Sequence, residues 1–210
     1  MCSVRSVTKT QAGKASAKKP ARKEAKASDP SARRPNREFS TARDMFRNGN
    51  FVAAASVLES IVRREPGNFE ALIFLASCYS FQGRYDEAVR CHEAAVDADP
   101  SDAQRWHNLA SDLLNLGDLE RAEKAMKEAI KLDGKSGFSH YGLARIFARK
   151  GEHDEALAIL KKAVELQPGL KENMSDQPDF AALAGDNRFK ELLGLKKDDF
   201  DYPFFERGET

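Results

Sequence analysis

The chain has 210 residues, of which 41% are hydrophobic and 32% are charged. A mean hydropathy of −0.60 and the lack of any apolar run of about twenty residues exclude a membrane-spanning segment. Three scattered cysteines provide neither a disulfide framework nor a metal knuckle. We therefore expect a soluble protein of a reducing compartment, and we predict a cytoplasmic location.

The net charge of +1 hides a strongly basic N-terminal segment. Residues 1–38 contain eleven Lys or Arg and three acidic residues, so they carry +8 and the rest of the chain carries −7. The segment has three prolines and no aromatic residue before Phe39. We predict that residues 1–34 form a disordered basic arm. Its composition fits a tail for nucleic acid or another anionic surface, a transit segment and a solubility leader, and these alternatives stay open.

After this arm, one pattern returns every 34 residues. Its glycine column is Gly49, Gly83, Gly117 and Gly151, and an alanine follows each glycine by five positions. A second alanine column precedes the glycines: Ala42, Ala76, Ala110 and Ala144. Apolar residues recur at helical spacing on both sides of each glycine. Each unit is therefore predicted to be two short helices, in which the glycine ends the first helix in a left-handed conformation and the alanines allow close packing.

The segments between units contain residues that typically end one helix and begin the next. Proline or glycine ends each second helix, and side-chain oxygens of Asn68, Ser101 and Ser136 are predicted to cap the helix that follows. Ser101 stands at the capping-box spacing from Gln104.

The four units, residues 35–68, 69–102, 103–136 and 137–170, resemble tetratricopeptide repeats. The third unit is the nearest match, with Trp106, Leu109, Ala110, Leu113, Gly117, Ala122 and Ala129 in signature positions. The first unit departs most, because Glu38 and Thr41 replace apolar residues. The resemblance implies an all-α fold, a right-handed superhelix (α-solenoid) of helix-turn-helix repeats. Such a scaffold serves many unrelated functions.

Two segments follow the repeats. Residues 171–195 contain the apolar positions Phe180, Leu183, Phe189, Leu192 and Leu193, and we predict short helices that cap the last repeat. Residues 196–210 form an acidic and aromatic tail. One hypothesis is that this tail fills the groove of its own or a neighbouring chain, giving autoinhibition or self-association. The alternative is that its aromatic residues pack behind the last helices.

The sequence contains no pattern typical of a catalytic or metal site. Four histidines are spread over the repeats without metal-ligand spacing, and His92 falls in a normally buried column, so we interpret it as a core residue. Phosphate-loop, nucleophile-elbow and CxxC motifs are missing. We predict a protein without catalytic activity and without a cofactor.

The resemblance also implies which side chains of the first helices face a concave groove. These candidate peptide-binding residues are Phe39, Arg43, Phe46, Arg47, Phe74, Ser77, Phe81, His107, Asn108, Ser111, Tyr141, Arg145 and Arg149. The arginines come in pairs four residues apart, a spacing that places both on one helix face, where they can hold carboxylates. With aromatic residues between the basic ends, we predict a protein-interaction scaffold that binds an extended acidic and apolar peptide.

Two other interpretations remain beside this one. The arginines can simply pair with neighbours such as Asp44, Glu152 or Asp154, and the aromatic residues can pack between repeats. The family's lysine and asparagine clamp for a C-terminal carboxylate is not reproduced, because Asn108 alone matches it. The alternative function is association with nucleic acid or an anionic surface through the basic arm.

Overall fold

A computed structural model describes residues 30–195, with side chains from residue 37 onward. Most of the predicted basic arm, residues 1–29, and the whole predicted acidic and aromatic tail, residues 196–210, lie outside the described residues. The expectations for these two segments therefore stay predictions.

Within residues 30–195, eight α-helices follow one another, and two 3-10 helices and a ninth α-helix come after them. In chain order they are α1 (Pro30–Arg47), α2 (Phe51–Arg64), α3 (Phe69–Phe81), α4 (Tyr85–Ala98), α5 (Ala103–Leu116), α6 (Leu119–Leu132), α7 (Gly137–Lys150), α8 (His153–Leu166), η1 (Pro168–Asn173), η2 (Pro178–Leu183) and α9 (Asn187–Leu193). From α1 to α8, each helix packs on the next one in the chain, most extensively within α3–α4, α5–α6 and α7–α8. The described residues contain no strand, so the predicted all-α solenoid is confirmed.

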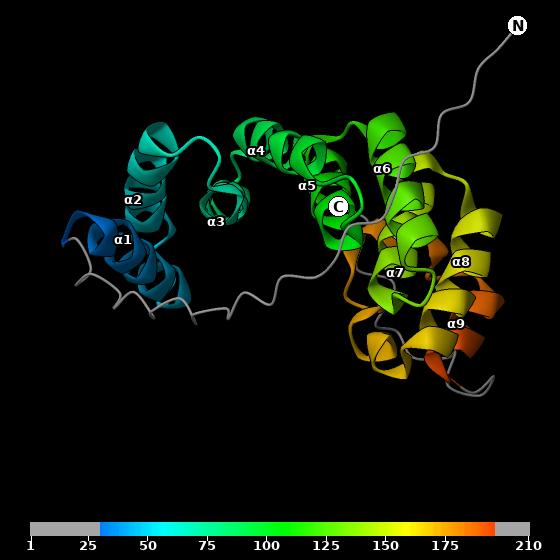
Figure 1. Ribbon diagram of the computed structural model, residues 1–210. Coiled ribbons are helices and arrows are strands. Elements are labelled where there is room, and N and C mark those ends of the chain that lie inside the picture. The colour runs from blue at the N-terminus through cyan, green and yellow to red at the C-terminus, as the bar shows by residue number, and fades with distance from the viewer. Residues whose placement is uncertain (1–29, 196–210) are drawn as a thin grey trace, which may run out of the picture.

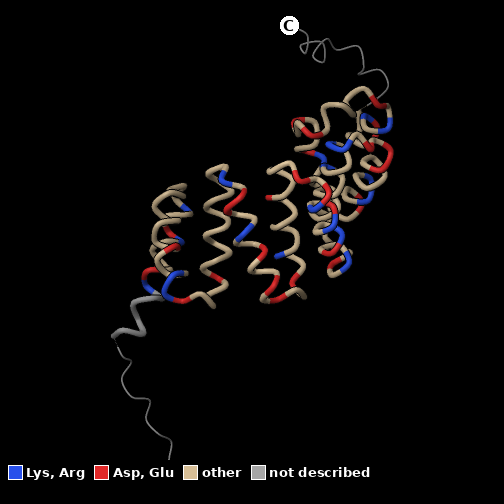
Figure 2. Tube along the Cα trace, turned by 90° about the horizontal axis from the view of Figure 1, so that it is seen from above, with Lys and Arg blue, Asp and Glu red and all other residues tan. Residues whose placement is uncertain are grey.

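The helices form a curved row with its two ends far apart. In Figure 1, α1 lies at one end of the row and α9 at the other, and the second helices α2, α4, α6 and α8 follow the outer side of the arc. Figure 2 shows the same row from above, with basic and acidic residues mixed along it. Because the second helices follow the outer side, the first helices α1, α3, α5 and α7 form the inner side of the row.

The glycine column ends the first helices in the predicted way. Gly49, Gly83, Gly117 and Gly151 have φ values of 76°, 73°, 93° and 80°. This left-handed region disfavours any side chain with a Cβ atom. The turn that joins the two helices of each repeat thus follows directly from the residue type.

The alanine columns provide the close contacts between helices. All eight alanines at these positions are fully buried: Ala42, Ala54, Ala76, Ala88, Ala110, Ala122, Ala144 and Ala156. Larger apolar side chains fill the space around them in two clusters, one in the first two repeats and one running from α4 to the end of the described chain. Burial of these apolar faces is what holds neighbouring repeats together.

One of the three predicted helix caps is wrong. Asn68 and Ser136 accept hydrogen bonds from the backbone N–H groups of Ala71 and Ser139, as expected. Helix α5 is instead capped by Asp102. The hydroxyl of Ser101 donates to the Asp99 carboxylate at 2.6 Å. The adjacent aspartate therefore takes the capping role.

The ends of the solenoid differ from each other. Helix α1 begins at Pro30, ahead of the expected start of the first unit at residue 35. Proline is tolerated in the first turn of a helix, which accounts for Pro30, whereas Pro35 is the sixth residue of α1 and nothing in the structure explains its place there. At the other end, Phe180, Leu183 and Phe189 of the predicted capping segment are buried. They pack against α7 and α8 through η2 and α9.

Candidate functional site

The candidate residues lie on the four first helices, in three zones along the inner side of the solenoid. Zone 1 is formed by α1 and α3, together with α2. Zone 2 lies between α3 and α5. Zone 3 lies on α7, where the capping segment η2 packs.

Zone 1 is a cluster of phenylalanines. Phe46 is the centre, with ring centroids 5.8 Å from Phe74 and 5.6 Å from Phe81 in edge-to-face contacts. Phe39 adds another edge-to-face contact to Phe74 at 5.4 Å. Phe51, at the start of α2, stacks on Phe81 at 4.5 Å. Phe81 nevertheless leaves 65% of its surface exposed, so the cluster presents an open aromatic side to solvent.

The two arginines of zone 1 lack a strong acidic partner among the described residues. Nε of Arg43 is buried and has no hydrogen-bond partner within residues 30–195. Arg47 pairs with Asp44 of its own helix at 3.1 Å, as the alternative interpretation expected, with side-chain exposures of 64% and 62%. An ion pair so exposed is weak and easily exchanged. Zone 1 thus offers guanidinium groups beside an aromatic surface.

Zone 2 contains a hollow of about 450 Å³ lined by four candidate residues. They are Ser77, Phe81, Asn108 and Ser111. The two serine hydroxyls donate to carbonyl groups of their own helices at 3.0 Å, and the Asn108 side-chain oxygen accepts from Gln104 at 2.7 Å. Apart from Phe81, the candidate positions in the middle of the inner side are therefore polar and uncharged.

A buried histidine and aspartate pair, His92 and Asp112, also lines this hollow. His92 is buried, as predicted, and its Nδ1 lies 2.7 Å from the Asp112 carboxylate, with side-chain exposures of 3% and 4%. The carboxylate accepts the Nδ1 hydrogen, while Nε2 has no hydrogen-bond partner among the described residues. Sequence reasoning missed Asp112, because its partner His92 comes from the preceding helix α4, and only the packing of α4 on α5 brings the two side chains together.

Zone 3 is already filled by the chain itself. Nε of Arg145 donates to the Asp179 carboxylate at 2.7 Å, and Nε of Arg149 lies 3.8 Å from the same carboxylate. Arg149 also donates to the Leu114 carbonyl at 2.6 Å. Tyr141 meets Phe180 edge-to-face at 5.4 Å. The α7 candidates are therefore occupied by η2, which the sequence analysis did not foresee.

His107 and Tyr141 sit at the border of zone 3. The pKa of His107 is lowered by burial and, to a smaller extent, by the positive charge of Arg145. Its Nδ1 lies 3.3 Å from the Ser139 hydroxyl. Burial also raises the pKa of Tyr141. Both groups are thus kept uncharged at neutral pH.

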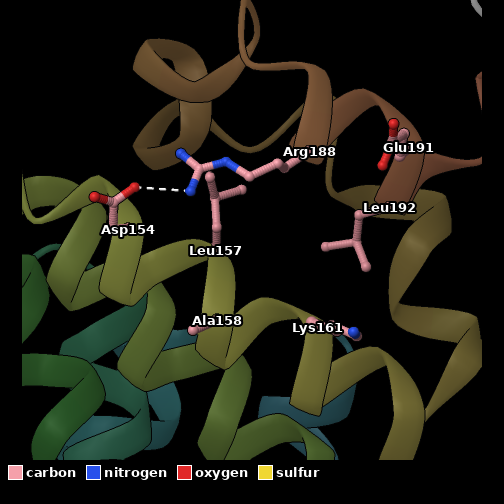
Figure 3. Close-up of a pocket in the computed structure, with 7 residues that line it drawn as sticks. All are labelled: Asp154, Leu157, Ala158, Lys161, Arg188, Glu191 and Leu192. Carbon is pink, nitrogen blue, oxygen red and sulfur yellow. Dashed lines mark ion pairs between the residues drawn. The ribbon is translucent and has the colours of Figure 1, made fainter.

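Of the other hollows in residues 30–195, one of about 240 Å³ is lined by the candidate His107 together with Ser136 and Ser139, and the two described next are lined by other residues. One of about 450 Å³ lies between α8 and α9, where the side chains of Leu157 and Leu192 face the space beside an Asp154–Arg188 ion pair of 2.8 Å (Figure 3). Another of about 490 Å³ lies between α4 and α6 on the outer side. Within residues 30–195, no group of His, Cys, Asp or Glu side chains could hold a metal ion.

Comparison with known proteins identifies the class of protein. Sequence profiles of the tetratricopeptide repeat match residues 45–113 and 107–171. Together with the fold, these matches show that the chain belongs to the tetratricopeptide repeat family, as the sequence resemblance predicted. Proteins of this family are in general interaction scaffolds, so a protein partner is the expected ligand class.

Particular relatives match the repeat region alone. The Caenorhabditis elegans Cell division cycle protein 27 homolog is 26% identical over 116 residues, which are 55% of this chain and 14% of that protein. TPR repeat-containing protein MJ1428 of Methanocaldococcus jannaschii is 32% identical over 98 residues, 47% of this chain and 17% of that protein. This chain thus matches less than a fifth of the length of either relative.

Solved structures confirm the fold. MamA from Desulfovibrio magneticus RS-1 has a TM-score of 0.62 at 24% identity, covering 64% of this chain and 76% of that chain. MamA MSR-1 has a TM-score of 0.60 at 26% identity, covering 68% of this chain and 82% of that chain. The first of these likenesses, at this level of identity, concerns the fold alone.

Catalysis and location remain predictions. A human relative of 29% identity over 99 residues is named Protein O-mannosyl-transferase TMTC1, and the match covers 11% of that protein. Repeats of this kind therefore also occur within proteins named as enzymes. No helix in residues 30–195 has the length and apolar character needed to cross a membrane.

Proposed function

We propose that the protein is a non-catalytic scaffold that binds an extended acidic and aromatic segment of another polypeptide along zones 1 and 2. The observation that carries this proposal is the open phenylalanine cluster of zone 1 beside Arg43 and Arg47. Packing of the repeats leaves Phe81 65% exposed. Open aromatic surface next to cationic groups is typical of a docking site.

The chemistry of the two zones defines the ligand. An aromatic or large aliphatic side chain gains apolar contact by covering Phe81, worth about 1.5–3 kcal/mol when fully buried. Carboxylates gain charge-assisted hydrogen bonds from the guanidinium groups. A peptide continuing into zone 2 meets serine and asparagine side chains, which suit main-chain groups. A basic peptide would leave both arginines facing like charge.

The test measures binding of two labelled peptide pools to the full chain by fluorescence anisotropy. Both pools contain the same aromatic residues, but one carries Asp and Glu where the other carries Lys and Arg. We expect binding of the acidic pool alone, and we expect Phe81→Ala to weaken it about ten-fold through lost apolar contact. Leu132→Ala is the matched control, because Leu132 is 42% exposed on α6, outside the three zones.

Two results would contradict the proposal. One is equal binding of the acidic and basic pools, which would remove the role of the arginines. The other is an unchanged affinity in Phe81→Ala, which would remove the role of the aromatic cluster. The nucleic-acid alternative rests on the basic arm outside the described residues, and no contact within residues 30–195 favours it over the peptide.

A further inference from the structure

The two ends of the solenoid carry the same three-residue arrangement. On α7, Tyr141, Arg145 and Arg149 are spaced four residues apart, and on α1 the same spacing relates Phe39, Arg43 and Arg47. The two sets stand three repeats of 34 residues apart, at equivalent positions. The inner repeats differ, with Ile, Ser and Phe in the second and His, Ser and Asn in the third. Only the end repeats thus combine an aromatic ring with two arginines.

The α7 set shows what this arrangement binds. Its ligand is the dipeptide Asp179–Phe180, whose carboxylate accepts from Arg145 Nε at 2.7 Å while the phenyl ring meets Tyr141 at 5.4 Å. The contact is well buried, since the Asp179 side chain is 14% exposed and Phe180 is 1% exposed. An acidic residue followed by an aromatic one therefore fits this surface.

The α1 set has the same donor without a ligand. Nε of Arg43, the atom equivalent to the Arg145 donor, is buried and has no hydrogen-bond partner among the described residues. A buried donor left unpaired is costly, which favours a ligand that supplies an acceptor. Phe39 is half-buried against Phe74 and keeps part of its surface accessible.

The chain contains such a ligand in its C-terminal tail. Residues 199–202 read Asp-Phe-Asp-Tyr, two acidic and aromatic pairs in succession. The tail is also the oppositely charged segment, whereas the N-terminal arm shares the positive charge of the arginines. Charge complementarity therefore favours the tail over the arm as the occupant of the α1 site.

The length of the chain between Leu195 and Asp199 indicates whether the tail that binds the α1 site comes from the same copy or from a second copy of the protein. Four peptide steps from Leu195 to Asp199 span roughly 14 Å when fully extended. Helix α1 lies three first helices away from α7, and packed helices are roughly 8–10 Å apart, so the α1 site is about 25 Å or more beyond the α7 site. Figures 1 and 2 show α1 and the capping segment at opposite ends of the row. The tail of the same copy is therefore too short to reach the α1 site, whereas the tail of a second copy can start next to that site.

We propose that residues 199–202 of one copy bind to Phe39, Arg43 and Arg47 of a second copy, as Asp179–Phe180 binds to α7 within one chain. Such a head-to-tail contact repeats from copy to copy and does not close unless a ring forms. The proposal rests on the proposed function, because it names one acidic and aromatic segment for zone 1.

The test uses two variants of the full chain in sedimentation-velocity runs across a concentration series. The site variant carries Arg43→Gln and Arg47→Gln, and the tail variant carries Asp199→Asn, Phe200→Ala, Asp201→Asn and Tyr202→Ala. We expect the unaltered chain to grow in mass with concentration and each variant alone to stay monomeric. Mixed together, the two variants should form a 1:1 dimer, because one keeps the site and the other keeps the tail.

A control variant, a check of the fold and two contradicting results complete this test. Arg63→Gln changes an exposed arginine in the last turn of α2 that is not one of the candidate residues, and this variant should associate like the unaltered chain. Circular dichroism of the site variant checks its fold, and the tail changes lie outside the described repeats. A monomeric unaltered chain at about 100 µM, or association that survives in both variants, would overturn the proposal. If the acidic peptide pool still binds in that case, the proposed function stands and only the self-recognition fails.

Discussion

The contact between the capping segment and α7 provides the sharpest test of the fold. Asp179→Ala removes the carboxylate that receives a hydrogen bond from Arg145 at 2.7 Å and faces Arg149 at 3.8 Å. The side-chain exposures of these two arginines are 24% and 34%, so their charges stay partly screened by water after the change. The consequence is a capping segment without its polar anchor.

The expected cost follows from the geometry. A hydrogen bond to a charged group contributes about 1.5–3 kcal/mol, and the longer, half-exposed second pair adds about 0–1 kcal/mol. We expect Asp179→Ala to lower the free energy of unfolding by about 2 kcal/mol. For a chain of this size, that change lowers Tm by about 4–8 °C.

Thermal and urea unfolding followed by circular dichroism measure this change. Asp176→Ala is the matched control, since Asp176 is exposed and receives a hydrogen bond from the neighbouring Ser175, and it should stay within about 0.5 kcal/mol of the unaltered chain. A Tm for Asp179→Ala within about 1 °C of the unaltered chain would refute the reasoning. Combination with Arg145→Met should cost less than the sum of the single changes, because both remove the same interaction.

Three further predictions concern packing, pH and thiol reactivity. Gly137→Ala would place a Cβ atom 2.6 Å from Cβ of Gln167, and the shift this forces should cost about 1–3 kcal/mol in urea unfolding. Hydrogen bonds from Lys127 and Lys150 lower the pKa of Glu123 below its ordinary 4.5, so its contribution is complete above pH 4.5 and is lost as the pH falls through the lower folded value, a loss visible in acid melts. Burial raises the pKa of Cys78 to about 11, so iodoacetamide should alkylate it slowly at pH 8.

Each of these predictions has its own check. Gly134→Ala should be nearly neutral, because its added Cβ would meet the Ile130 carbonyl at an ordinary 3.5 Å, and a Gly137→Ala chain of equal stability would show that α7 and α8 pack more loosely. Glu123→Gln should flatten the acid dependence, and an unchanged dependence would assign it to other carboxylates. Alkylation of Cys78 in the folded chain at the rate seen in urea would contradict its burial.

Local features of the repeats were readable from the sequence. The glycine column predicted the turns because only glycine enters the left-handed region freely, and the alanine columns predicted close helix contacts because small side chains let backbones approach. These signals act over a few residues and recur four times, so the helix pairs follow from them. The buried role of Phe180 in the cap was also predicted.

Contacts between segments far apart in the sequence could not be predicted from such local patterns. The placement of η2 on the inner side of α7, which joins Asp179 to Arg145, depends on how the chain returns after the last repeat. The part of Phe51 in zone 1 was not predicted, because Phe51 belongs to a second helix. Its stacking on Phe81 arises only when the first two repeats pack together.

The sequence by itself determined the repeat, the turns and the buried columns, since these depend on backbone conformation and helical spacing within each unit. Tertiary structure alone decided which end of the inner side is occupied and which has no occupant among residues 30–195. The physical reason is that the two end repeats carry equivalent aromatic and arginine residues, and only the position of the capping segment satisfies the charges of one set and leaves the other accessible.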